Sequence, residues 1–181
     1  MRKTILTYGI ISGLTVIILM LLNFVLMNKN ILTFENSELV GYSSIIISLS
    51  MIFFGIKSYR DNKLKGEIKF WKAAQVGFLI TLVASLLYGF GWEIYYQTNY
   101  SEVNGFMKNY SQHYIDKASE EGKSEEEIET ITKEMADMTE MYKNPVVRFG
   151  FTLLEIIPVG ILITLISAGI LRRKDILAET V

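Results

Sequence analysis

The 181-residue chain contains no cysteine, two prolines and a single histidine. The lack of cysteine excludes disulfide bonds and cysteine-ligated metal sites, and one histidine is too few for a zinc site of the usual ligand types. The sequence also lacks the GxGxxG, P-loop, GxSxG and HExxH motifs and the spacing of an EF-hand. We therefore expect no enzymatic activity, no catalytic residue, no cofactor and no bound metal.

Charged residues make up 20% of the chain, yet four long blocks contain almost none of them. A helix needs roughly 20 apolar residues to cross about 30 Å of hydrocarbon, and the blocks meet or approach this length. The pattern predicts an all-α membrane protein, a single membrane domain over residues 1–181 with four transmembrane helices. The predicted spans cover about residues 4–27, 39–58, 71–97 and 146–171. The first is longer than the apolar part of a signal peptide, so we expect it to be retained.

Lysine and arginine are divided unequally between the connections. One side carries 11 of them, in the amino-terminal segment, in the 57–72 loop and in Arg172, Arg173 and Lys174; the other carries seven, mostly in one long segment. Since short cytoplasmic loops are enriched in these residues, we expect a multi-pass protein of the cytoplasmic (inner) membrane with both termini in the cytoplasm. Aromatic residues typical of membrane interfaces mark the ends of the third span: Trp71 inside, and Trp92, Tyr95, Tyr96 and Tyr100 outside.

Residues 98–145 form the one sizeable polar segment, with 11 acidic residues against five lysines. Apolar residues recur at three- and four-residue steps on both sides of Gly122, which is typical of two amphipathic helices. These residues are Val103, Phe106, Met107, Tyr110 and Tyr114, followed by Ile128, Ile131, Met135, Met138 and Tyr142. Ser124 and Glu127 match a capping box, and Asn144-Pro145 matches a helix start.

This segment therefore predicts an acidic extracytoplasmic helical hairpin inserted between the third and fourth spans. Its apolar faces can pack on each other, present a groove to a partner protein, or do both. A solvated acidic linker is the alternative. The acidic character argues against nucleic acid and anionic surfaces as partners.

Small residues recur at every fourth position along the third span: Ala73, Gly77, Thr81, Ser85 and Gly89. The fourth span carries Gly160, Thr164 and Ala168, and the first carries Gly9 and Gly13. Rows of small residues allow membrane helices to approach closely. We expect this helix-packing row to contact another helix of the same chain, and a contact between two copies is the alternative.

Two carboxylates lie inside the predicted spans. Glu93 is near the outer end of the third span, where its side chain can extend to water. Glu155 is roughly 13 Å into the fourth span at 1.5 Å per residue, where an ionised carboxylate costs about 2.5–3.5 kcal/mol. We hypothesise that Glu155 pairs with Arg148, seven residues earlier on the same helical face, or with a polar group of the third span (Thr81, Ser85 or Tyr88).

Pro158 follows Glu155 by three residues. It cannot donate to the carbonyl of Leu154, which leaves that acceptor free and is expected to bend the helix. A carboxylate, a free carbonyl and a bend suit a structural bond between helices, and they also suit an ion or proton site. Both interpretations remain open at this point.

Five blocks of the sequence resemble one family of bacterial membrane proteins, the domain of unknown function 4199. They are ILTYGIISGL (5–14), GYSSIIISLSMIFFGIKSYRD (41–61), FWKAAQVGFLITLVASLLYGFGWEIYY (70–96), EMADMTEMYKNP (134–145) and LLEIIPVGILITLISAGILRRK (153–174). The resemblance implies an uncharacterised multi-span protein of a bacterial cytoplasmic membrane. It implies no activity, ligand or catalytic residue.

These features favour a non-enzymatic accessory or interaction protein that uses its outer hairpin. The alternative is a small oligomeric transporter or channel, coupled to ions or protons through Glu155 and Glu93. The expected partners are the lipid bilayer and either another protein or further copies of the chain.

Overall fold

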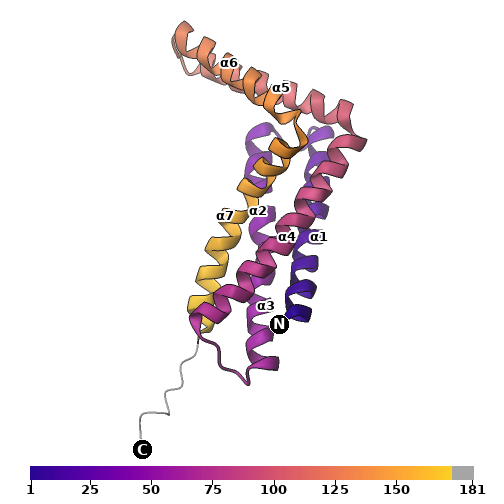
Figure 1. Ribbon diagram of the computed structural model, residues 1–181. Coiled ribbons are helices and arrows are strands. Elements are labelled where there is room, and N and C mark those ends of the chain that lie inside the picture. The colour runs from indigo at the N-terminus through magenta and orange to yellow at the C-terminus, as the bar shows by residue number, and fades with distance from the viewer. Residues whose placement is uncertain (173–181) are drawn as a thin grey trace, which may run out of the picture. The chain divides into compact units, whose positions relative to one another are not determined.

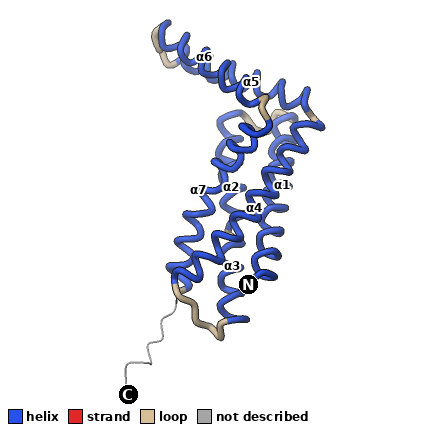
Figure 2. The backbone as a smooth tube through the Cα atoms, viewed as in Figure 1, coloured by secondary structure: helices blue, strands red, loops and turns tan. Residues whose placement is uncertain are grey.

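The computed structural model describes residues 1–172, and every regular element in that range is an α-helix (Figure 1, Figure 2). The helices are α1 (Arg2–Asn28), α2 (Phe34–Leu49), α3 (Met51–Lys63), α4 (Phe70–Thr98), α5 (Tyr100–Glu120), α6 (Glu125–Tyr142) and α7 (Pro145–Leu171). Arg173 and Lys174, which the charge count included, lie outside the described residues.

Four segments are long and apolar enough to cross a membrane: Arg2–Asn28, Phe34–Lys63, Phe70–Thr98 and Pro145–Leu171. They coincide with the four predicted spans, so the prediction of an all-α protein with four membrane-spanning helices is confirmed at the level of helix length and composition. The second of these segments consists of α2 and α3. The two helices meet at Ser50, whose hydroxyl donates to the carbonyl of Ile47 at 2.6 Å and competes there with the backbone ladder.

The described chain divides into two compact units, residues 1–89 together with 152–172, and residues 90–151. The core of the first unit is apolar and is built from α1, α2, α3, α4 and α7. Its fully buried side chains include Leu49, Ile52, Ile56, Ile80 and Ile156. In a membrane, lipid tails are as apolar as these side chains, so close van der Waals packing is the main contribution that such a core makes to helix association.

The row of small residues on α4 is buried along its whole length, and it contacts α7. A Cβ atom on Gly77 would lie 2.7 Å from Cγ2 of Thr164, and a Cβ atom on Gly160 would collide with the side chain of Thr81. The hydroxyl oxygens of Thr81 and Thr164 are 3.4 Å apart. Gly77 and Thr81 of the row thus contact a helix of the same chain, at a distance that a Cβ atom on Gly77 or Gly160 would not permit.

The glycines of α1 pack on a different face of α4. A Cβ atom on Gly9 would lie 2.7 Å from Val83, and one on Gly13 would lie 2.8 Å from Leu87. Between these glycines, buried Ser12 donates its hydroxyl to the carbonyl oxygen of Ser48 on α2 at 2.6 Å. Helix α1 therefore contacts α2 through a hydrogen bond and α4 through two close glycine contacts.

In the second unit, α5 and α6 lie side by side and are joined by a short turn (Figure 1). Gly122 in that turn has φ +74°, which glycine adopts without strain because it has no Cβ. The predicted capping box is present: Ser124 accepts from the amide of Glu127, and the Glu127 carboxylate accepts from the amide of Ser124 at 2.8 Å. Both arms are helical, which disfavours the alternative of a solvated acidic linker.

The residues of the predicted apolar seams are among the less exposed residues of these two helices. On α6 the five seam residues are half-buried and, apart from Thr139, the rest of the helix is exposed. On α5 Val103 is fully buried, and the other four seam residues are half-buried. Helix α7 then begins as expected, with the amide of Val146 donating to Oδ1 of Asn144 at 2.9 Å.

Candidate functional site

Glu93 and Arg148 form a bidentate ion pair in the second unit. Nε of Arg148 donates to Oε2 of Glu93 at 2.9 Å, and Nη2 donates to Oε1 at 2.6 Å. The pair joins the last turns of α4 to the first turn of α7. Arg148 is only 2% exposed, and the side chain of Glu93 is 18% exposed. The two parallel bonds use the planar fork of the guanidinium, which a lysine does not possess.

The remaining edge of the Arg148 guanidinium binds the end of α6. Nη1 donates to the carbonyl oxygen of Tyr142 at 2.8 Å and to that of Lys143 at 3.4 Å. These are carbonyls at a helix carboxyl terminus, where no further backbone donor is available and where the helix dipole favours a cation. One side chain thereby holds α4, α6 and α7 together.

The ring of Tyr96 lies against this guanidinium. Its central carbon lies 3.6 Å from the ring centroid of Tyr96, a cation–π contact. Nε1 of Trp92 donates to the phenol oxygen of Tyr142 at 2.8 Å. We call the group of Trp92, Glu93, Tyr96, Tyr142 and Arg148 the arginine anchor.

The anchor has the chemistry of a structural joint. Both carboxylate oxygens of Glu93 accept from Arg148, and Oε1 accepts a further bond from Gln97 at 2.7 Å. A carboxylate held in this way is fully paired and is not presented as a base or as an ion ligand. The metal-ligating residue types also form no group able to hold a metal ion within residues 1–172.

The structure corrects two predictions about these residues. Arg148 binds Glu93, so its hypothesised pairing with Glu155 is wrong, and Glu93 does not simply extend to water. The reason is that helical spacing relates residues along one helix, whereas the partner of Arg148 comes from another helix 55 positions away. Trp92 and Tyr96, which mark the outer end of the third span, are both buried, and the ring of Tyr96 lies against the guanidinium.

One sequence signal could have indicated the anchor. Arg148 is the single arginine between Arg60 and Arg172, in a segment whose other cations are lysines. Because arginine is preferred where bidentate and stacked contacts are needed, its presence there was informative. The contributions of Gln97 and Tyr142 had no comparable signal.

Glu155 and Pro158 belong to the first unit, where both are exposed on α7. Helix α7 continues through Pro158 without interruption. Two of the proposed polar partners on α4 are bonded to their own helix: Thr81 donates to Gly77 at 3.1 Å and Ser85 donates to Thr81 at 2.8 Å. Among the residues described, Glu155 forms no hydrogen bond or ion pair.

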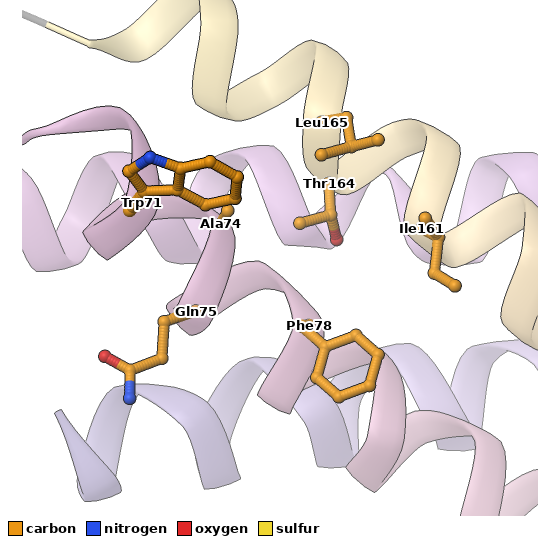
Figure 3. A pocket seen from close by; sticks show the side chains of 7 residues that line it. All are labelled: Trp71, Ala74, Gln75, Phe78, Ile161, Thr164 and Leu165. Atoms are coloured by element: carbon orange, nitrogen blue, oxygen red, sulfur yellow. The ribbon is translucent and has the colours of Figure 1, made fainter.

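An apolar groove of about 310 Å³ also lies between α4 and α7 in the first unit (Figure 3). Its lining residues are Trp71, Ala74, Gln75, Phe78, Ile161, Thr164 and Leu165. Lys72 donates to Gln75 at 2.9 Å beside the groove. Its lining contains no acid, no base and no pair of residues that could act as a nucleophile and its base. The groove therefore suits contact with a hydrocarbon chain rather than chemistry.

The model of the family described as "Protein of unknown function (DUF4199)" matches residues 7–173. No match exists among curated proteins or among solved structures.

Proposed function

The chain belongs to this DUF4199 family, and we propose that it is a non-enzymatic accessory protein of a bacterial inner membrane that contacts a partner protein through α5 and α6. In this proposal both termini are cytoplasmic and the α5–α6 pair is extracytoplasmic. The unequal distribution of lysine and arginine supports that orientation. The resulting protein displays an acidic helical arm outside the membrane.

The arginine anchor is the observation that carries this proposal. A helical pair that served only as a connection would not need a buried guanidinium at its base. Here Arg148 fixes the end of α6 to α4 and α7 through four hydrogen bonds and one aromatic contact. A fixed base restricts the orientations of the arm, and preorganisation of this kind reduces the entropy that binding costs.

The surface of the arm indicates the charge of the partner. The residues of the apolar seams are buried or half-buried, and most of the exposed residues of α6 are polar. On α6 the exposed acids include Glu126, Glu129 and Glu134. A basic protein surface complements them, since complementary charge favours encounter and disfavours wrong partners.

The orientation is tested by introducing single cysteines, because the natural chain has none. Intact cells producing either Glu126→Cys or Lys65→Cys are treated with a membrane-impermeant maleimide. We expect labelling of Glu126→Cys in intact cells and of Lys65→Cys only after lysis. The opposite result would invert the orientation and remove the outer arm from the proposal.

The interaction is tested by photo-crosslinking from Thr132 on α6 in native membranes. We expect a heteromeric adduct that disappears when Glu126, Glu129 and Glu134 are changed together to glutamine. A matched variant places glutamine at the exposed, uncharged Ala136 and should keep the adduct. If the acid-free arm still forms the same adduct, the proposed recognition is wrong.

A further inference from the structure

We propose that Glu155 is a proton-binding site, a carboxyl group that α7 holds in its neutral form on the lipid-facing surface of the membrane-spanning unit. The inference is independent of the proposed partner of α5 and α6. It follows from the contrast between the two carboxylates inside the spans.

The position of Glu155 makes an ionised form costly. It lies ten residues after Pro145, the first residue of α7, which corresponds to about 15 Å along the helix axis. The side chains that flank it on the exposed surface of α7 are apolar, with Leu154 70% exposed and Leu162 59% exposed. A carboxylate among such neighbours would face hydrocarbon, and protonation removes its charge.

No positive charge of the described chain compensates Glu155. From Thr152 to Leu171 it is the only titratable residue of α7, and the facing part of α4 from Ala73 to Gly89 contributes only Tyr88. Lys72 of α4 binds Gln75, and Arg60 of α3 reaches the carbonyl of Leu171 at the other end of α7. The nearest cation along α7 is Arg148, which is committed to Glu93.

The available ligand atoms select a proton over a metal cation. Glu155 offers one carboxyl group, and Pro158 leaves the carbonyl of Leu154 without its helical donor. Calcium takes six to eight oxygen ligands and magnesium six, far more than these two groups supply. A neutral carboxyl needs no such shell, because its hydroxyl donates a single hydrogen bond.

A hydrophobic carbodiimide tests the proposal, since such reagents modify protonated carboxyl groups in apolar surroundings. The full-length protein in phosphatidylcholine vesicles is treated at about pH 6 and about pH 9, and adducts are located by peptide mass spectrometry. We expect modification of Glu155 that falls about tenfold or more over this range, as a titrating acid requires. Glu93, whose oxygens are paired with Arg148, is the internal control and should stay unmodified.

Infrared spectroscopy provides a second measurement that a merely structural residue would not change. The neutral-carboxyl stretch of the wild-type protein should weaken at the higher pH and be missing in Glu155→Gln. The variant Glu155→Asp should retain both the band and the carbodiimide adduct. The proposal is overturned if Glu155 is unreactive, if its reactivity does not depend on pH, or if Glu93 reacts equally.

Discussion

Replacing Arg148 with methionine should loosen the base of the α5–α6 pair more than any single change on its surface. Methionine preserves much of the side-chain volume but removes the charge and every donor. Glu93 would then keep a carboxylate that is 18% exposed and bonded only to Gln97. The carbonyls of Tyr142 and Lys143 would lose their guanidinium donor as well.

The magnitude follows from the burial of the pair. Removing one partner of a buried ion pair costs about 3–5 kcal/mol, mainly because the other charge remains uncompensated. Glu93 keeps some contact with solvent and one amide donor, so we expect the lower end, about 3 kcal/mol. For a chain of this size, each 1 kcal/mol corresponds to about 2–4 °C in Tm, which gives a decrease of about 6–12 °C.

The assay is thermal unfolding by circular dichroism in lipid nanodiscs, together with amide hydrogen exchange at the end of α6. The second change Glu93→Gln removes the stranded charge, so the double variant should recover about 1–2 kcal/mol. The variant Lys123→Gln is the control, because its contact with Glu121 is exposed and 3.7 Å long. Such surface pairs contribute about 0–1 kcal/mol.

The reasoning would be refuted by an Arg148→Met variant whose Tm stays within about 2 °C of the wild type. It would also be refuted if Glu93→Gln failed to improve that variant. Either result would mean that the charge pair adds little to the attachment of α6. The arm would then have to be held by its aromatic contacts alone.

Two further predictions concern the packing row and the capping box. Gly160→Ala should destabilise the protein by about 1–3 kcal/mol, because the added Cβ collides with Thr81. Adding Thr81→Ser to this variant removes the obstructing methyl group and should restore part of the lost stability, measured by thermal unfolding. Hydrogen bonds from the amide and hydroxyl of Ser124 lower the pKa of Glu127 below its usual 4.5. The Glu127 carboxylate therefore stabilises the first turn of α6 fully above pH 4.5, and this stabilisation is lost as the pH falls through the lower pKa of the folded state. Amide hydrogen exchange in the first turn of α6 measures the loss.

Each of these predictions has a matched control in the chain. A Cβ atom on Gly169, also in α7, meets no atom within 4 Å, so Gly169→Ala should leave the free energy of unfolding within about 0.5 kcal/mol. For the capping box, Ser124→Ala removes a bond that lowers the pKa of Glu127, and that pKa should rise toward 4.5. An unchanged pKa in this variant, measured by NMR titration, would contradict the assigned cause.

The sequence was sufficient for most of the helices and for the ends that local patterns mark. It did not predict the division of the second span into α2 and α3 at Ser50, or its extension from residues 39–58 to Phe34–Lys63. Four apolar blocks, the break at Gly122 and the caps at Ser124 and Asn144 are local patterns, and local patterns determine where helices begin and end. The small residues of α4 were also visible, since their four-residue spacing places them on one face. Which helix covers that face was beyond local pattern, and the structure assigns it to α7.

The arginine anchor was largely hidden from the sequence. Arg148 and Glu93 are far apart along the chain, and Glu155, on the same helix, was the more obvious partner for Arg148. Which carboxylate pairs with Arg148 depends on how α4 and α7 are placed around Tyr142. The spacing of residues along a single sequence does not reveal that placement. Polar residues at helix ends are therefore harder to pair by inspection than small residues within helices.

The two glycines of α1 have a consequence for biosynthesis. Gly9 and Gly13 contact Val83 and Leu87, which follow them by 74 residues in each case. At roughly 5–20 residues per second, the ribosome needs about 4–15 s to make that stretch. During this interval α4 has not yet been made, so the glycine surface of α1 is uncovered. Membrane chaperones or quality-control proteases should therefore bind α1 in nascent chains that are halted before residue 83.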